Sequence, residues 1–319
     1  MNNHHLWILW RLLIRHAPRL VLIALASALM AWTPNFFTVD SLATILVLAS
    51  IVGVLAVGQA FVLISGGFDL SQGAIVALTA AAAAKLATSG GMSLATIAPL
   101  ILLLGAVLGS ANGLCVAAVG TNPFVTTLST QLIYRGAAFV LLQGEPIINV
   151  WAFALLERGP IVGRTLLSNR AFVFLAVAAV SWFVLRKTVF GRHLYAVGGN
   201  VRAARLSGLP TIRLRTAAFA LSGAAAALAA MMLLSWVRVA KADTGMGIEL
   251  DVIAACVVGG ISLQGGSGSV LGAALGGLVL QALSSYITIR GFPDEYRSLA
   301  TGAVILAFAA ADSMARRAR

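Results

Sequence analysis

The sequence predicts an all-α fold, a polytopic membrane helix bundle. Of its 319 residues 60% are hydrophobic and only 10% are charged, and the mean hydropathy is +0.97. That much apolar surface exceeds what one soluble core can bury, so the chain is expected to lie in a bilayer. Apolar runs of about 20 residues, the length that crosses a bilayer core, recur with only short polar breaks. Residues 1–319 are therefore expected to form one membrane domain.

Glycine, proline and charged residues divide these runs into about ten spans, with discontinuous helices where glycines interrupt them. In chain order the predicted spans cover residues 20–33, 41–64, 71–87, 94–118, 123–141, 168–186, 214–236, 249–264, 268–286 and 298–312. The first span also resembles a secretory signal, because three arginines precede it and Ala-Ser-Ala occurs at 26–28. A retained helix is the favoured interpretation, since the apolar run continues through Trp32 and another span follows at once.

Basic residues predict the orientation. Thirteen of the 22 Lys and Arg residues lie before the first span, between Arg186 and Arg215, or after the last span. An even number of spans places these three segments and both termini on one face, which the positive-inside rule makes the cytoplasmic face. The net charge of +12 would also suit nucleic acid or an anionic substrate, but clustering at span ends favours topology as its cause.

Two internal echoes predict two related halves. "GFDLSQGAI" (67–75) is matched loosely by "GIELDVIAA" (247–255), and "LGAVLG" (104–109) is matched more closely by "LGAALG" (271–276). In transporters built from repeats, the pathway lies at the repeat interface, where discontinuous helices supply polar groups. The spaced glycines of 104–109 and 271–276 are typical of close helix packing.

The stretch "SGGFDLSQG" (65–73) places Asp69 inside apolar surroundings. Its three glycines loosen the helix, and backbone without helical hydrogen bonds is tolerated at membrane depth only beside protein or a water-filled cavity. Asp69 is therefore expected to face such a cavity. The alternative is a surface loop in which Asp69 caps a helix that starts near Ser71. The same two interpretations apply to Glu249 and Asp251.

Enzymatic chemistry is not indicated. The chain has no Gly-x-x-x-x-Gly-Lys-Ser/Thr motif for ATP, and the glycine-rich 265–272 contains no lysine. The four histidines all fall in polar segments predicted to be cytoplasmic: His4, His5, His16 and His193. Cys115 and Cys256 lie in apolar runs and are expected to be buried hydrophobes. No catalytic residue and no metal site are predicted, whereas a proton-coupled secondary transporter that titrates Asp69 or Glu249 stays an alternative.

The longest predicted cytoplasmic connection, residues 186–215, contains a short helix. Gly198 and Gly199 are expected to break the chain, and Asn200 to cap a helix over 201–206. Gly208 and Pro210 are expected to stop that helix. An exposed helix here suits a partner protein, although a basic loop that only fixes topology is an equal alternative.

The segment "GRHLYAVGGNVRAARLSGL" resembles the cytoplasmic loop of the ribose-type permeases, the membrane subunits of ATP-binding cassette sugar importers. Further similarities follow in order along residues 41–312: "SGGFDLSQGAIVAL", "NPFVTTLSTQLIYRGAAFVL" followed by "GEPI", and "GMGIELDVIAACVVGGISLQGGSGSVLGAALG". The chain is identified on these motifs as a member of this binding-protein-dependent inner membrane component family.

The resemblance implies a multi-pass permease of the bacterial inner membrane that translocates a monosaccharide or similar polar solute. It implies half-repeats at about 41–141 and 214–312, joined by a coupling segment at about 187–213 that docks a cytoplasmic ATPase. Implied partners are that ATPase, which carries the ATP, a periplasmic sugar-binding protein, a second permease subunit and the lipid bilayer. No cofactor is expected on this chain itself.

Two sets of residues follow from the resemblance. A neutral sugar needs hydroxyl, amide and carboxylate partners, which gives as pathway candidates Phe68, Asp69, Ser71, Asn112, Phe124, Thr126, Thr127 and Glu249. The candidates for ATPase coupling are Gly199, Asn200, Ala203, Ala204, Arg205, Leu206, Ser207 and Gly208.

Overall fold

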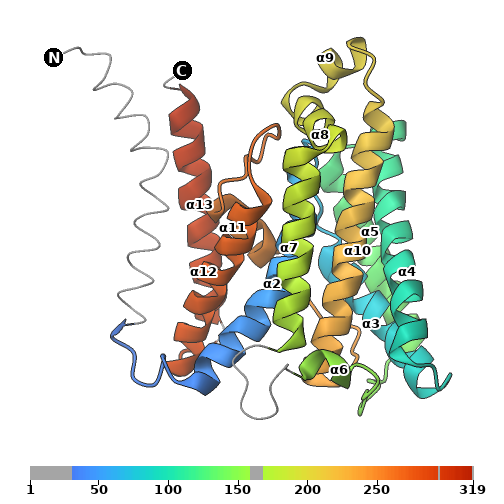
Figure 1. Cartoon of the computed structure of the whole chain (residues 1–319), viewed down its shortest axis with the longest axis vertical. Helices are drawn as coiled ribbons and strands as arrows, with labels where there is room; N and C mark the ends of the chain where they lie inside the picture. Colours follow the sequence, from blue (N-terminus) through green and yellow to red (C-terminus); the bar gives the residue numbers. More distant parts are fainter. Residues whose placement is uncertain (1–30, 159–167, 294, 318–319) are drawn as a thin grey trace.

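The computed structural model describes residues 31–158, 168–293 and 295–317, which form a bundle of α-helices (Figure 1). The described helices are α2 (Val39–Ile64), α3 (Gln72–Thr88), α4 (Leu94–Leu114), α5 (Pro123–Leu142), α6 (Ala154–Glu157), α7 (Asn169–Lys187), α8 (Val189–Gly199), α9 (Val201–Leu206), α10 (Thr211–Val237), α11 (Ile248–Val258), α12 (Val270–Ile289) and α13 (Glu295–Arg317). A π-helical turn, η1 (Cys115–Val119), continues α4. Among the described residues, β-type pairing is limited to one bridge between Ile147 and Ala240.

Six of the described helices are long and apolar enough to cross a membrane. They are α2, α4 with its π-turn, α5, α7, α10 and α12, whereas α3 is apolar but shorter. The prediction of an all-helical membrane protein is therefore confirmed. Most of the first predicted span lies outside the described residues, together with His4, His5, His16 and the arginines that precede it.

The predicted span at 249–264 is too long. Helix α11 ends at Val258, and residues 259–269 form a loop. Four glycines of this loop have positive φ angles, which side chains rarely adopt: Gly260 (+88°), Gly265 (+88°), Gly266 (+69°) and Gly268 (+140°). A helix cannot continue through them, so α11 ends at Val258.

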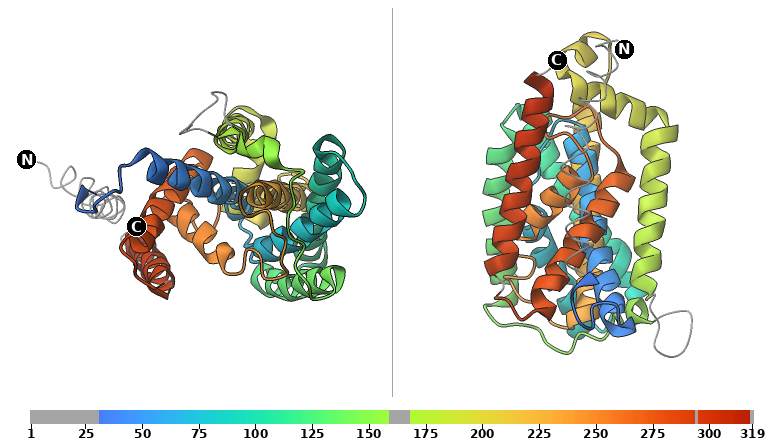
Figure 2. Two further views of the ribbon diagram at one scale, coloured as in Figure 1. Left: turned by 90° about the horizontal axis from the view of Figure 1, so that it is seen from below. Right: turned by 90° about the vertical axis from the view of Figure 1, so that its left-hand side faces the viewer.

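Helices α2 and α10 pack against each other in the middle of the bundle. Helix α4 packs along α10, and α12 packs along α2, while α3 contacts α10 and α11 contacts α2. On the outer flanks α5 packs on α3, and α13 packs on α11. Figure 2 shows the resulting arrangement end-on, and its second view places α7 at one margin and α13 at the other.

The spaced glycines of α4 and α12 pack as predicted. A Cβ added to Gly105 would collide with the backbone oxygen of Gly223, and one added to Gly223 would collide with Gly105, so α4 and α10 touch backbone to backbone. Gly272 on α12 and Gly259 after α11 are related in the same reciprocal way. Small residues here permit the close approach.

The two ends of the bundle differ. The short helices α8 and α9 lie at one end, where the C-terminal end of α13 also lies, and α6 lies at the opposite end (Figure 1). Helix α8 continues through Gly198 and Gly199 instead of breaking there, and the chain turns at Asn200. The prediction of a short helix over 201–206 is confirmed.

Candidate functional site

Asp69 lies in the segment between α2 and α3 and is completely buried. Its Oδ1 atom accepts hydrogen bonds from the backbone N–H of Ser71 (2.9 Å) and from the Ser71 hydroxyl (2.6 Å). Its Oδ2 atom accepts a hydrogen bond of 2.8 Å from the hydroxyl of Ser222 on α10. A buried carboxylate is costly unless such donors surround it, and here both oxygens have partners.

Beyond Ser71 and Ser222, the hydrogen bonds of Asp69 extend to side chains on α3, α4 and α5. Asn112 on α4 donates to the Ser71 hydroxyl (2.7 Å), and Tyr134 on α5 donates to the side-chain oxygen of Asn112 (3.1 Å). On the other side, Gln72 at the start of α3 donates to the Ser222 hydroxyl (2.8 Å). We call these six residues the Asp69 network. It fastens the interruption after α2 to α4, α5 and α10.

Three members of the Asp69 network were not among the sequence candidates: Gln72, Tyr134 and Ser222. Ser222 stands in an alanine-rich run, 217–230, and the one hydroxyl in that run is the local signal by which it could have been found. Tyr134 follows the apolar pair 132–133, and its position on α5 does not identify its partner. The predicted residues Asp69, Ser71 and Asn112 do come together, although they lie 43 positions apart at most.

A second polar cluster lies between α5 and α11. Gln131 donates a hydrogen bond of 2.9 Å to Oε1 of Glu249, which is 7% exposed. Arg135, one turn further along α5, donates through Nη1 to the backbone oxygens of Ala242 and Thr244, each at 2.9 Å. The other carboxylate oxygen of Glu249 and the Nη2 atom of Arg135 are buried without a hydrogen-bond partner. This cluster therefore retains one acceptor and one donor for a further polar group.

The position of Glu249 also explains why residue 73 is a glycine. A Cβ added to Gly73, in the first turn of α3, would lie 2.5 Å from the unpaired carboxylate oxygen and would collide with the backbone oxygen of Gly245. Only glycine allows α3 to approach the start of α11 this closely. The two stretches that echo each other in the sequence, 67–75 and 247–255, therefore meet in space.

The remaining pathway candidates gather at the start of α5. Thr127 is buried, and its hydroxyl donates to the backbone oxygen of Pro123 (2.8 Å), with the backbone oxygen of Phe68 also within reach at 3.3 Å. The rings of Phe68 and Phe124 are 6.5 Å apart, and Phe124 is largely exposed. Thr126 is half-buried, and its hydroxyl donates to the backbone oxygen of Asn122 at the start of its own helix (2.9 Å).

A cavity of about 470 Å³ opens between α2, α10, α11, α12 and α13. Asp251 and Arg297 on its wall form an ion pair with an N–O distance of 2.5 Å, and the Thr301 hydroxyl donates to the other Asp251 oxygen (2.9 Å). The wall also includes Gln281 and Ser298. Its size is within the range of cavities that hold small molecules. Sequence reasoning considered Asp251 but did not connect it with α13, because the two partners are separated by 46 positions.

The predicted coupling residues lie on and around α9. Asn200 caps the helix by accepting a hydrogen bond from the backbone N–H of Ala203 (2.9 Å), and Gly208 follows it with a φ of +80°. Ala204 is buried and anchors the helix, whereas Arg205 and Leu206 are exposed. The other members of the set are also exposed: Gly199, Ala203 and Ser207. Helix α9 therefore presents a basic and apolar surface at this end of the bundle.

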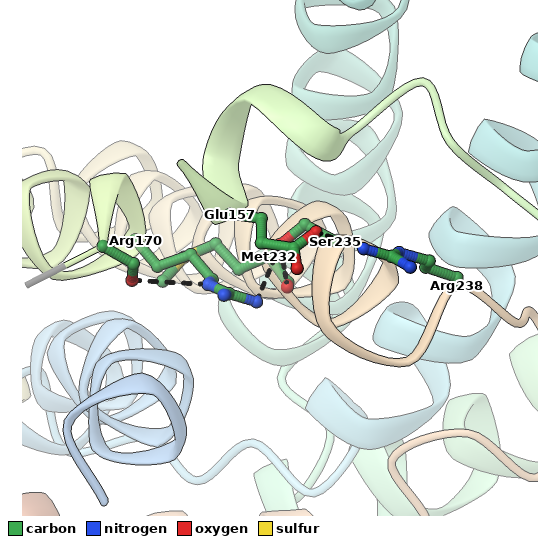
Figure 3. Close-up of polar contacts among 6 residues, drawn as sticks. Glu157, Arg170, Met232, Ser235 and Arg238 are labelled. Atoms are coloured by element: carbon green, nitrogen blue, oxygen red, sulfur yellow. Dashed lines mark hydrogen bonds and ion pairs between the residues drawn. The ribbon is translucent and has the colours of Figure 1, made fainter. Parts of the chain in front are cut away.

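The opposite end carries a cluster of arginines that links α6, α7 and α10 (Figure 3). Arg238, after α10, forms an ion pair of 2.6 Å with Glu157 and lies over the ring of Trp151. Arg170, at the start of α7, donates a hydrogen bond of 3.3 Å to the Ser235 hydroxyl. These contacts join α6, α7 and α10 at the end away from α8 and α9.

No metal-binding group of three His, Cys, Asp or Glu residues occurs in the ranges that the structure describes. Cys256 is buried and donates to the backbone oxygen of Ala56 (3.3 Å), which agrees with its predicted role as a buried hydrophobe. Cys115 is half-buried.

Comparison with known proteins gives a consistent result over nearly the whole chain. Residues 41–309 match the family described as "Branched-chain amino acid transport system / permease component". The ribose import permease protein RbsC of Haemophilus influenzae is 35% identical over 308 residues, which cover 95% of this chain and 94% of the relative. The L-arabinose ABC transporter permease protein AraH of Azospirillum brasilense is 33% identical, with coverages of 97% and 91%. The autoinducer 2 import system permease protein LsrC of an Enterobacter species is 33% identical, with coverages of 94% and 86%. No solved structure matches the chain.

Proposed function

This chain belongs to the permease-component family named for branched-chain amino acid transport, and from that premise we propose that it translocates a monosaccharide or a similar small polar solute. The observation that carries the choice of solute is the set of relatives, which are named for ribose, L-arabinose and autoinducer 2 and are aligned over more than 85% of their lengths. Membership of the family makes the chain a transport subunit and not itself an enzyme. ATP is bound by a separate subunit.

We propose that the chain is built from two related halves, residues 41–141 and 214–312, within about ten spans. The packing described above supports this proposal when α2, α3, α4 and α5 are matched with α10, α11, α12 and α13. Under that matching, the contact of α4 with α10 corresponds to that of α12 with α2. The contacts of α3 with α10 and with α5 likewise correspond to those of α11 with α2 and with α13. When the two halves are interchanged, each of these helix pairs is thus replaced by its counterpart. This is the pattern expected of a pseudo-two-fold axis.

The proposed orientation places α8 and α9 in the cytoplasm, together with both termini. Seven basic residues between Arg186 and Arg215 support it, because no acidic residue occurs between Glu157 and Asp243 to balance them. The ATPase is then proposed to dock on α9, and the binding protein on the opposite end, near α6. A second permease subunit, identical or related, completes the proposed complex.

We propose that the solute passes the polar groups that lack partners and not those that are already paired. Glu249, with Gln131 and Arg135, offers an unpaired acceptor and donor to a hydroxylated solute. Asp69, Ser71 and Asn112 have their hydrogen bonds satisfied within the bundle, so their proposed role is to hold the interruption after α2 in place. Phe68, Phe124, Thr126 and Thr127 are proposed to shape the wall at the start of α5.

The test is transport by the reconstituted complex of permease, ATPase and binding protein. Uptake of labelled ribose, arabinose and a branched-chain amino acid is measured with ATP inside the vesicles, and again with only an imposed pH gradient. ATP-dependent uptake of a sugar is expected. Uptake of the amino acid in place of both sugars would refute the proposed solute class, and uptake driven by the pH gradient alone would favour the proton-coupled alternative.

A further inference from the structure

A basic cavity of about 310 Å³ lies where α7 meets α8 and the start of α12. Two arginines line it, Arg186 at the end of α7 and Arg192 on α8. Trp182 and Tyr195 form its aromatic wall, and Ser269 and Val270 at the start of α12 complete it. None of these residues belongs to the pathway or to the α9 surface described above.

The charged side chains that line this cavity are all positive. Both arginine side chains belong to exposed residues, and the sequence has no acidic residue between Glu157 and Asp243. Burial raises the pKa of the Tyr195 phenol, and the positive charge of Arg186 acts on it in the opposite sense, which places Arg186 close to that wall. Two cations that converge on one cavity favour an anionic ligand.

The start of α12 also favours an anionic ligand in the cavity. Its first helical hydrogen bond runs from the N–H of Ala273 to the oxygen of Ser269, so the N–H groups of residues 270–272 precede it. Ser269 occupies the N-cap position without a side-chain capping hydrogen bond. The positive end of a 20-residue helix therefore opens on the cavity together with the arginines.

The walls of the cavity are held in place. The Tyr195 hydroxyl donates a hydrogen bond of 2.9 Å to the backbone oxygen of Gly268, which joins α8 to the loop before α12. Leu185 forms a buried floor. The cavity is therefore formed by three separate elements in a fixed arrangement.

The position of the cavity favours a lipid headgroup as the anion. Helix α7 is one of the membrane-length helices, and its apolar surface is exposed at Leu175, Val180 and Phe183, at the margin of the bundle (Figure 2). Arg186 and Lys187 end that apolar surface, so the cavity lies at the membrane–water boundary beside lipid. Tryptophan and tyrosine are enriched at this level, and basic pockets between helices there bind acidic headgroups.

We propose that the cavity lined by Arg186, Arg192 and the start of α12 binds the phosphate of an anionic phospholipid headgroup. This inference does not depend on which solute is transported. A free phosphate ion shares the same chemistry, but it would not use Trp182 or the lipid-facing position.

The test uses the full chain in nanodiscs that contain phosphatidylcholine with a small fraction of phosphatidylglycerol. Phosphatidylglycerol retained by the protein is counted by native mass spectrometry, and its apparent affinity is measured by titration. The double variant Arg186→Gln/Arg192→Gln is expected to bind roughly tenfold or more weakly, because each basic residue near the membrane surface adds to the attraction. Arg213→Gln removes an exposed arginine near the same end that does not line the cavity, and it is expected to bind within about twofold of wild type.

A second variant separates loss of the site from loss of the fold. Ser269→Asp places a carboxylate at the N-cap of α12, which favours the helix but repels an anion in the cavity. We expect wild-type or higher thermal stability together with loss of retained phosphatidylglycerol. Unchanged retention in this variant and in the double variant would overturn the proposal, as would an equal loss in Arg213→Gln.

Two further measurements distinguish a lipid headgroup from a free phosphate ion and from the ATPase. Saturable binding of inorganic phosphate in discs of phosphatidylcholine alone, removed by the double variant, would assign the cavity to a free anion and overturn the lipid assignment. If the double variant retains its phosphatidylglycerol but no longer co-elutes with the ATPase, the cavity belongs to the protein interface, and the proposal is wrong.

Discussion

Ser222 on α10 donates a hydrogen bond of 2.8 Å to Asp69, although the two residues are 153 positions apart. The same hydroxyl accepts a hydrogen bond from Gln72. One serine thus connects the central helix α10 to both the interruption after α2 and the first turn of α3. The interruption after α2 is therefore held by this contact in addition to its own glycines.

Ser222→Ala should therefore destabilise the fold. It leaves Asp69 with one unpaired oxygen and Gln72 with one fewer partner, and a buried polar group without its partner costs about 1–3 kcal/mol. Thermal unfolding of the purified chain, followed by helix content, measures the loss. Ser110→Ala is the matched control, because the Ser110 hydroxyl bonds only to Ala106 of its own helix and its loss should change stability by less than about 0.5 kcal/mol. Equal stability of the two variants would contradict the role assigned to Ser222.

The helices could largely be predicted from the sequence, whereas the hydrogen-bond partners within the Asp69 network could not. Apolar runs and their glycine and proline breaks give the ends of α5 and α10 within a few residues, because burial in lipid requires long continuous apolar stretches. The cap at Asn200 follows from local chemistry alone. Which hydroxyl reaches Asp69 depends instead on how α10 rotates against α3 and α4, and a single sequence does not contain that rotation.

The same distinction applies to Glu249. Its sequence context predicted a polar group at an interruption, which the structure places at the start of α11. Its contact with Gln131 joins α11 to α5 across 118 positions. Gln131 carries no local signal, because a glutamine on a polar turn of α5 reads as a surface residue. Only the packing of α3 between α5 and α11 brings these side chains together.

A backbone contact should make Gly198 intolerant of substitution. A Cβ at this position would collide with the backbone oxygen of Ile64 and lie 2.7 Å from the backbone nitrogen of Gly266, two groups that share a hydrogen bond of 3.0 Å. Gly198→Ala is expected to lower stability by about 1–3 kcal/mol, as overpacking usually does. A Cβ on the neighbouring Gly199 would meet nothing within 4 Å, so Gly199→Ala should leave the melting temperature nearly unchanged. Parallel thermal melts decide the matter, and equal behaviour of the two variants would show that α8 does not contact the α2 interruption this closely.

Glu249→Gln should weaken solute handling more than folding. The amide can still accept the hydrogen bond from Gln131, but the unpaired carboxylate oxygen that is proposed to meet the solute becomes an NH₂ group. Loss of a charge-assisted hydrogen bond predicts an increase of roughly tenfold or more in the solute concentration for half-maximal uptake. Asp69→Asn is the comparison, and it should lower folded yield without that shift. An unaltered concentration dependence in Glu249→Gln would remove Glu249 from the proposed path.

The ion pair on the wall of the 470 Å³ cavity can be tested by a double-mutant cycle. Arg297→Gln leaves the carboxylate of Asp251, which is 18% exposed, with only the Thr301 hydroxyl as a partner, and stability should fall by about 1–3 kcal/mol. Asp251→Asn/Arg297→Gln removes both charges and should recover at least half of that loss. Strict additivity of the two single changes would mean that the pair contributes no coupling, and the contact between α11 and α13 would then rest on apolar packing.

Arg205→Glu should separate ATP hydrolysis from transport without unfolding the chain. Arg205 is exposed on α9, whose ends are fixed by the Asn200 cap and by the positive φ of Gly208, so its charge is held at a defined place on the proposed docking surface. Docking depends on complementary charges, and reversal of one sign costs several kcal/mol of complementarity in a well-paired interface. We expect weaker co-elution with the ATPase and a loss of uptake, while the melting temperature stays within about 2 °C of wild type because an exposed side chain contributes little to stability. Arg213→Glu applies the same charge change at the start of α10, where the coupling segment of about 187–213 ends and outside the eight predicted coupling residues, and should retain both co-elution and uptake. ATPase activity is measured with and without loaded binding protein for all three proteins. Wild-type stimulation and wild-type uptake in Arg205→Glu would return α9 to the simpler role of a topology signal.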